Sequence, residues 1–157
     1  MNEIKGLDEI QRKLKSLPDK IGRNAMKRSL RKGANVIRDA ARGNAKRLDD
    51  PDTSESIAKN IAVQSGNRRR ERQEGGPVMR VGVMGGARDM GKYGEFKGAG
   101  KGNPGGDTFY WRFLEFGTSN MAARPFMRPA MATAGGAALD ATVAAMQSET
   151  DKELAKL

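Results

Sequence analysis

Aromatic side chains are concentrated in one short segment, and this segment places the strongest constraint on the fold. Five of the eight aromatic residues in the chain lie between positions 109 and 116. In a strand, side chains alternate between two faces, and both faces here would be apolar. Such a strand lies at the centre of a sheet or is covered by another subunit. We therefore predict a strand over residues 108–116, with these candidate subunit-interface residues: Phe109, Trp111, Phe113 and Phe116.

Residues 7–48 carry a helical pattern. Apolar side chains recur there at spacings of three and four, beginning with Leu7, Ile10, Leu14, Leu17, Ile21 and Ala25. Within this run, Ser16 suits a helix N-cap, Pro18 suits a first turn, and Asp19 offsets the exposed amides there. We predict a short helix, a break at 16–18, and a long helix that ends near Leu48.

The long helix has a basic face opposite its apolar stripe, with cations spread over residues 23–47. Such a face can follow phosphates. Asp39 interrupts it, however, and no aromatic side chains are interleaved for stacking on bases. A solvated or protein-facing surface is therefore favoured over a nucleic-acid site.

Two short strands are expected in the middle of the chain. Pro51 ends the long helix because it disfavours helix in the preceding residue, and Asp52 can cap one more short turn through Ala58. Residues 61–65 and 77–84 then have strand patterns, which together predict a hairpin. Its basic connection holds candidate contacts to DNA or to an acidic partner: Arg68, Arg69, Arg70 and Arg72.

Residues 85–107 form a glycine-rich segment, with nine glycines among 23 residues. Ordering such a segment costs much conformational entropy, so a flexible loop or a functional arm is expected. Gly100 to Gly105 match the spacing of a dinucleotide-binding loop, but that loop needs a strand before it and a helix after it. Neither is expected here, and we predict no cofactor site.

A C-terminal helix is predicted from Arg128-Pro129, because proline is favoured in a first helical turn. An apolar stripe continues from Met131 to Leu157, and Gly135-Gly136 within it permits either a close backbone contact or a bend. The predicted fold class is α+β. A long N-terminal helix and a C-terminal helix pack on a small, mostly antiparallel sheet, in a single domain over residues 1–157.

The chain contains no histidine and no cysteine. This excludes Ser-His-Asp and Cys-His catalysis and removes the usual zinc ligands, so an enzyme is disfavoured, and we assign no catalytic or metal-binding residue. Glu115 is the only carboxylate in the aromatic segment and has no identifiable titratable companion. We therefore expect it to form an ion pair or a hydrogen bond, with Arg124 or Arg128 as the candidate partner.

The formal net charge of +10 indicates a partner of opposite charge, and both a nucleic acid and an acidic protein fit it. No segment approaches the roughly 20 apolar residues of a membrane span. The N-terminus also lacks the apolar core of a signal peptide. We expect a protein of the cytoplasm, or of a particle assembled there, with no membrane partner.

Residues 110–131 join the aromatic segment to a proline-containing linker, and this combination resembles the lambdoid-phage "gene product ten" family of neck and tail-completion proteins. Members have an aromatic strand ending in Glu-aromatic-Gly-Thr, then a short linker and Pro-Phe-apolar-Arg-Pro-Ala at the start of a C-terminal helix. The matching positions are Glu115, Phe116, Gly117, Thr118, Pro125, Phe126, Met127, Arg128, Pro129 and Ala130. The long glycine-rich arm before the motif departs from the family pattern.

The motif has a physical rationale. Gly117 permits a tight exit from the aromatic segment, and Thr118 can hydrogen-bond the turn backbone. Phe126 would anchor the incoming helix on the sheet, and Arg128 would meet Glu115. The residues that stiffen the linker are Pro125 and Pro129.

The resemblance implies a structural subunit of a ring at the head–tail joint, which joins the tail to the head and passes the genome. The implied partners are further copies of the chain, with six expected from tail symmetry, and neighbouring connector, tail terminator or tail tube proteins. Phage DNA would occupy the lumen without sequence-specific contacts. The implied location is the virion, after assembly in the host cytoplasm. The alternative, from charge alone, is a basic DNA-binding protein without enzymatic activity.

Overall fold

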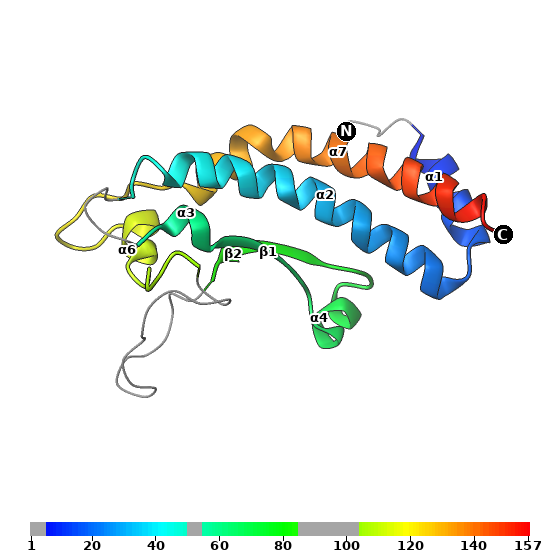
Figure 1. The fold of residues 1–157 in the computed structure, drawn as a ribbon, viewed down its shortest axis with the longest axis horizontal. Helices are drawn as coiled ribbons and strands as arrows, with labels where there is room; N and C mark the ends of the chain where they lie inside the picture. Colours follow the sequence, from blue (N-terminus) through cyan, green and yellow to red (C-terminus); the bar gives the residue numbers. More distant parts are fainter. Residues whose placement is uncertain (1–5, 50–54, 85–103) are drawn as a thin grey trace. The chain divides into compact units, whose positions relative to one another are not determined.

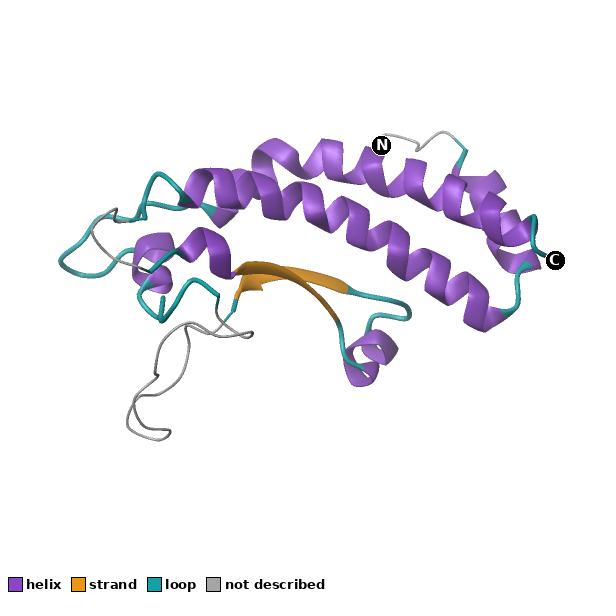
Figure 2. Cartoon of the chain, in the orientation of Figure 1, coloured by secondary structure: helices purple, strands orange, loops and turns teal. Residues whose placement is uncertain are grey.

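The computed structural model describes residues 6–49, 55–84 and 104–157. Long helices dominate these residues, and a single pair of strands forms the only sheet among them (Figures 1 and 2). The helices are α1 (Leu7–Ser16), α2 (Asp19–Ala45), α3 (Ile57–Asn60), α4 (Arg68–Gln73), α6 (Trp111–Phe116) and α7 (Met127–Leu154). The strands are β1 (Ile61–Ser65) and β2 (Met79–Val83). This is the predicted α+β class, with an antiparallel sheet.

The described residues fall into two compact units. Unit 1 consists of the described residues within Met1–Asn35, Gln64–Arg80 and Gly136–Leu157. Unit 2 consists of those within Val36–Val63 and Val81–Gly135. Each unit therefore contains a part of α2 and a part of α7.

In unit 1, the first part of α2 packs against the last part of α7. Small side chains make this close approach possible. A Cβ on Gly33 would overlap Thr142 Oγ1 and would lie 2.5 Å from the carbonyl oxygen of Ala138. Apart from glycines, the buried residues on these parts of the two helices are Ala25, Ser29, Ala138, Ala145 and Thr150. At the periphery, the Arg28 guanidinium forms ion pairs with Glu149 and Glu153.

The predicted break between the first two helices is confirmed, but the predicted capping role of Ser16 is wrong. Ser16 is the last residue of α1, and its hydroxyl donates a hydrogen bond to the Lys13 carbonyl at 2.7 Å. Leu17 is extended and buried. The carbonyl of Pro18 instead accepts the first hydrogen bonds of α2, from the N–H groups of Ile21 and Gly22.

In unit 2, a core cluster joins the end of α2 and the start of α7 to α3 and the sheet. Phe126 is fully buried in it. The other buried members of this cluster are Ala41, Ala45, Ile57, Ala58, Ile61 and Ala130, and Val81 and Val83 of β2 pack against it. Phe126 thus anchors the start of α7, as predicted.

The element that precedes β1 is a single helical turn. Ser56 is the N-cap of α3, and its hydroxyl accepts a hydrogen bond from Lys59 N at 3.3 Å. Asp49 supports this cap, because its carboxylate accepts from Ser56 Oγ and from the N–H of Ile57, both at 2.8 Å. The sequence indicated a turn here but assigned its cap to Asp52, which lies outside the described residues.

The predicted strand over residues 108–116 is wrong, because residues 111–116 form the helix α6. Its hydrogen bonds run from Leu114 N to the Tyr110 carbonyl and from Gly117 N to the Phe113 carbonyl. In a helix, Phe109, Phe113 and Phe116 share one face at spacings of four and three. The strong strand propensity of these aromatic residues is overridden, since a helix buries Glu115 and half-buries Leu114 on the other face.

The strand pair and the start of the C-terminal helix lie close to where the sequence predicted them. β1 and β2 form the expected antiparallel pair, but their connection contains the helix α4 rather than a simple tip. The start of α7 at Met127 lies one residue before the predicted one. Most of the glycine-rich segment, residues 85–103, lies outside the described residues. At its end, Gly105 is buried. Its carbonyl accepts a hydrogen bond from Ser56 N, and its N–H donates to the side-chain oxygen Oδ1 of Asn60, both at 2.7 Å.

Gly135-Gly136 lies within α7, and a Cβ at either position would meet nothing within 4 Å. Within the described part of the chain, this pair does not make the close helix contact that the sequence allowed, and Gly33 makes one instead. Among residues 6–49, 55–84 and 104–157, no helix combines the length and apolarity that crossing a membrane requires.

Candidate functional site

The buried carboxylate of Glu115 organises the family motif in unit 2. Its Oε2 accepts hydrogen bonds from the N–H groups of Phe126 (2.7 Å) and Met127 (3.0 Å), and its Oε1 accepts from the N–H of Arg128 (3.0 Å). These donors lie at the start of α7, where backbone N–H groups have no partner within the helix. Glu115 therefore caps α7 from α6, across a linker of ten residues.

The ion pair expected for Glu115 is formed by Arg128, whose Nε lies 3.2 Å from Oε1. Arg124 contributes a backbone contact instead, from its N–H to the Leu114 carbonyl at 2.7 Å. Burial raises the pKa of the Glu115 carboxyl, but the N–H donors of Met127, Phe126 and Arg128 and the Arg128 guanidinium outweigh it. The pKa therefore lies below the ordinary value of 4.5, so the group stays ionised near neutral pH.

The other motif residues shape the turn between α6 and α7. Gly117 has φ +76°, a conformation that favours glycine, and a Cβ there would lie 2.9 Å from the Met121 carbonyl oxygen. Thr118 pairs with Met121 through the backbone, and its hydroxyl accepts from Asn120 N at 3.3 Å. The tight exit and the turn hydrogen bond are as predicted. The linker proline Pro125 is exposed.

Three of the four candidate interface aromatics are exposed: Phe113 and Phe116 on α6, and Phe109 two residues before its start. Phe109, Phe113 and Phe116 are 42%, 48% and 65% exposed, and we call these three residues the aromatic stripe. Phe109 and Phe113 are in edge-to-face contact, with ring centroids 6.4 Å apart. Arg128 lies over the Phe116 ring, 5.5 Å from its centroid, so the stripe adjoins the Glu115–Arg128 pair.

Trp111, the fourth candidate, is separate from the stripe. It packs against the core cluster of unit 2, and its Nε1 is buried with no hydrogen-bond partner in the described part of the chain. A strand would place Trp111 on one face with Phe109 and Phe113. The helix instead places Trp111 against the core cluster, while Phe109 and Phe113 are exposed.

In unit 1, α4 presents its arginines to solvent. Asn67 caps this helix, accepting from Arg70 N at 2.9 Å. The arginines named from the sequence are all exposed: Arg68, Arg69, Arg70 and Arg72. Glu71 is 3% exposed and pairs inward with Arg23 and with Lys27 (2.8 Å) on α2. Hydrogen bonds from Lys27 and Arg23 lower the pKa of Glu71.

A hollow of about 280 Å³ lies beside α4 and is lined by Asn67, Arg69, Arg70, Gln73 and Arg80. The sequence did not single out Arg80 or Glu71. Glu71 is the one carboxylate within a run of arginines, three residues after Arg68, and this spacing indicates pairing along its own helix rather than with α2.

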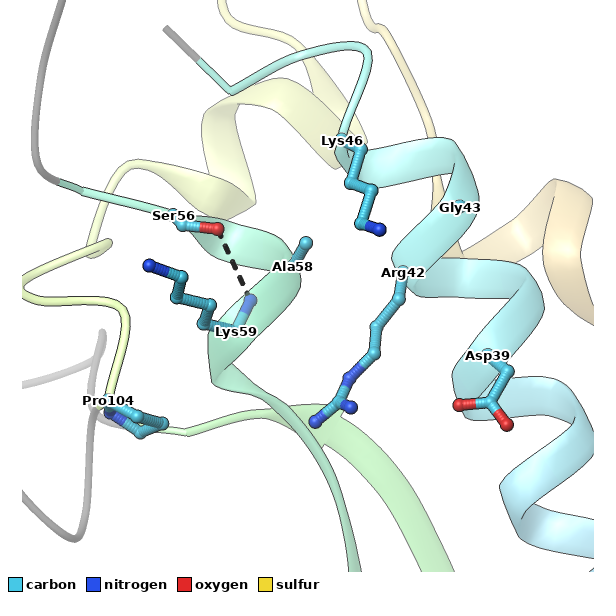
Figure 3. Close-up of a pocket in the computed structure, with 8 residues that line it drawn as sticks. All are labelled: Asp39, Arg42, Gly43, Lys46, Ser56, Ala58, Lys59 and Pro104. Atoms are coloured by element: carbon cyan, nitrogen blue, oxygen red, sulfur yellow. Dashed lines mark hydrogen bonds between the residues drawn. The ribbon is translucent and has the colours of Figure 1, made fainter. Parts of the chain in front are cut away.

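A second hollow, of about 570 Å³, lies in unit 2 between α2 and α3 (Figure 3). Its cations are Arg42, Lys46 and Lys59. The Arg42 guanidinium is held by the Ile61 carbonyl at 2.7 and 3.0 Å, and Asp39 in the lining pairs with Arg38 at 2.8 Å. Figure 3 shows Lys46, the residue after the end of α2, projecting toward the α3 side. The lining thus carries three cations and one carboxylate, and this carboxylate is paired with Arg38.

A family model described as "Bacteriophage HK97-gp10, putative tail-component" matches residues 8–117. The match includes Glu115 and Gly117, whereas the Pro-Phe half of the motif lies beyond it. Searches of curated proteins and of solved structures gave no match. Because the matched residues make up more than half of the chain, the protein belongs to the HK97-gp10-like family of bacteriophage tail components, whose members have a structural role.

Proposed function

We propose that the chain is a subunit of a neck or tail-completion ring that joins the phage tail to the head and lets the genome pass. The observation that carries this proposal is the aromatic stripe. Phe109, Phe113 and Phe116 leave much of their ring surface in water, although the core of unit 2 has a fully buried phenylalanine. Aromatic residues are enriched in the centres of protein interfaces, where they supply most of the binding energy.

The stripe is also preorganised for binding. Glu115 follows Leu114 in α6 and fixes the end of this helix to the first turn of α7 through three backbone hydrogen bonds. Arg128 then contacts both Glu115 and the Phe116 ring. Little ordering entropy is lost when an already ordered aromatic surface binds, so more of the burial free energy is retained as affinity.

The partner that we propose for the stripe is another copy of the chain. Repeated head-to-tail contacts between identical subunits form a closed ring when the rotation from one subunit to the next is a whole fraction of a full turn. Six copies would match the symmetry of phage tails. The faces of the ring would contact neighbouring connector, tail terminator or tail tube proteins, in the virion and during assembly in the host cytoplasm.

A structural role for Glu115 is supported by its contacts. Both carboxylate oxygens accept hydrogen bonds from backbone N–H groups, and its pKa lies below the ordinary carboxyl value. A general acid requires the opposite shift. We therefore assign Glu115 to the architecture of the motif and propose no enzymatic activity.

The proposal is tested with phage particles produced without this chain. Adding the purified protein to separated heads and tails should yield joined, infectious particles. The double variant Phe113→Ser/Phe116→Ser should fail to do so while keeping its helical circular dichroism spectrum. Met131→Ser removes another exposed apolar side chain, 58% exposed and outside the stripe, and should act like the wild type. Joining by the stripe variant, or infectious particles without the chain, would contradict the proposal.

A second candidate function is a basic DNA-binding protein without a place in the virion. The exposed arginines of α4 and the net charge of +10 favour it. In that case the chain would remain a monomer, would bind DNA with steep salt dependence, and would be absent from purified particles. Mass spectrometry of purified virions separates the two candidates.

A further inference from the structure

We infer that the outward arginines of α4, together with Arg80 of β2, form a contact site for the phosphate backbone of double-stranded DNA that does not depend on base sequence. We call this set the arginine face: Arg68, Arg69, Arg70, Arg72 and Arg80. The inference deepens the proposed passage of the genome and rests on that proposal, because it names the surface that meets the DNA.

The fold separates the charges of α4 by sign. In the sequence, Glu71 interrupts four arginines, which suggests mutual neutralisation along the helix. In the structure, Glu71 points inward and is neutralised by Arg23 and Lys27 of α2. The carboxylate therefore neutralises cations of α2, and the exposed charged side chains within Arg68–Gln73 are all arginines. The next exposed carboxylate along the chain is Glu74, at the C-cap of α4.

The arginine face is not neutralised by the rest of the described chain. No ion pair joins Arg69, Arg70 or Arg80 to a carboxylate among the described residues, and the same holds for Arg68 and Arg72. Three of these arginines line one small hollow. Like charges held this close repel one another, and a bound anion removes the repulsion.

The donor types suit phosphate. Every cation of the face is an arginine, whose planar guanidinium matches the oxygens of a phosphate in a bidentate fashion. The hollow is completed by Asn67 and Gln73, whose side chains are polar and uncharged. It is therefore a polar, cationic recess in which a phosphate group finds several donors.

The surroundings favour a DNA backbone over a protein partner. Protein interfaces have an apolar centre, but residues 66–80 contain no exposed large hydrophobic side chain. They also contain no aromatic residue on which an unpaired base could stack. Phosphate contacts without stacking or base readout are typical of sequence-independent binding to duplex DNA.

The test is a salt series with the full-length protein and labelled duplexes of two unrelated sequences. Both duplexes should bind equally. In Arg69→Gln/Arg70→Gln/Arg80→Gln, the slope of log K against log salt should become shallower by about 2.7, from about 0.9 for each of three lost phosphate contacts. The matched control is Lys15→Gln/Lys20→Gln/Lys32→Gln, which removes the same charge from exposed lysines of unit 1. In this control the slope should change by less than about 0.9, the value expected for one phosphate contact.

An equal decrease of the salt slope in the lysine control would overturn the inference, because DNA binding would then depend on net charge alone. A polyglutamate competitor that displaces DNA from the wild type, and that itself binds with the same arginine dependence and greater affinity, would also overturn it in favour of an acidic protein. A strong preference for one duplex would exclude backbone recognition. Failure of the ring proposal is seen separately, as a monomeric mass or as absence from virions, and leaves these slopes interpretable.

Discussion

Glu115 and Arg128 are joined at three points: Glu115 Oε1 accepts from the backbone N–H and from the Nε of Arg128, and the Glu115 carbonyl accepts from the same guanidinium. The last turn of α6 and the first turn of α7 are thereby held together, although ten residues of linker separate Glu115 from Phe126. The contact explains why a glutamate stands among exposed aromatic residues.

Replacing Glu115 should destabilise the protein. In Glu115→Gln, the amide cannot accept from all three N–H groups at the start of α7, and each buried donor left unpaired costs roughly 1–3 kcal/mol. We expect a loss of about that size in the free energy of unfolding, measured by urea denaturation. Glu74→Gln, at an exposed position, is the control and should change it by less than about 0.5 kcal/mol. Equal effects would contradict the capping role.

Acid should destabilise the protein through three carboxylates. Hydrogen bonds from Lys27 and Arg23 lower the pKa of Glu71, those from Arg28 lower the pKa of Glu149, and the donors described above outweigh burial at Glu115. A lowered folded-state pKa adds stability that is present above the ordinary value of 4.5 and is lost as the pH falls through the folded-state pKa.

The free energy of unfolding should therefore fall steadily below about pH 4.5, as protons bind the unfolded state more readily than the folded state. Denaturation curves at a series of pH values measure this. The free energies of unfolding of the wild type and of Glu71→Gln, plotted against pH, should converge toward acid pH. The variant lacks the ion pairs of Glu71 with Arg23 and Lys27 at every pH, and the wild type loses them as Glu71 is protonated. A constant difference between them at every pH would show that the pKa of Glu71 is the same in the folded and unfolded states, and would contradict its stabilisation by Lys27 and Arg23.

Phe126 should be the most sensitive side chain of the motif. It is fully buried in the core cluster of unit 2, so Phe126→Ala removes a ring and leaves a cavity. We expect a loss of about 3–5 kcal/mol, measured by thermal or urea unfolding. Phe113→Ala removes the same group from a ring that is 48% exposed and should cost far less stability. Unchanged thermal stability in Phe126→Ala would refute the anchor role.

Two helical glycines should respond in opposite directions to alanine. Gly33→Ala places a Cβ against Thr142 and Ala138, which should cost about 1–3 kcal/mol through overpacking. Gly136→Ala meets nothing within 4 Å and should stabilise α7 by about 0.5–1 kcal/mol, since alanine favours helix. Thermal melts of both variants measure this. A destabilised Gly136→Ala protein would contradict the open surroundings of that glycine.

Most of the helical fold could be predicted from the sequence, because long periodic patterns are strong local signals. The break at Pro18, the long second helix and the entry of α7 near Arg128 follow from proline positions and apolar spacing. The strand pair also follows from local alternation. The fold class was therefore accessible, although only two strands are present among the described residues.

The helix α6 was not predictable in this way. Aromatic residues favour strands, and the segment is too short for the helical period to stand out against alternation. A tertiary contact of Glu115 favours the helix over a strand. In the helix, the Glu115 carboxylate reaches the start of α7 while Leu114 packs against the core. The same limit hid the inward turn of Glu71, because its partners lie more than 40 residues earlier in the chain.

Assembly through the aromatic stripe can be measured as the solution mass of the purified protein, by light scattering during size-exclusion chromatography. The wild type should have a mass that is a multiple of the single-chain mass. The variant Phe109→Ser/Phe113→Ser/Phe116→Ser should be folded and have the single-chain mass. A wild-type protein that stays at the single-chain mass at every concentration, or a stripe variant that keeps the multiple, would contradict assembly through the aromatic stripe.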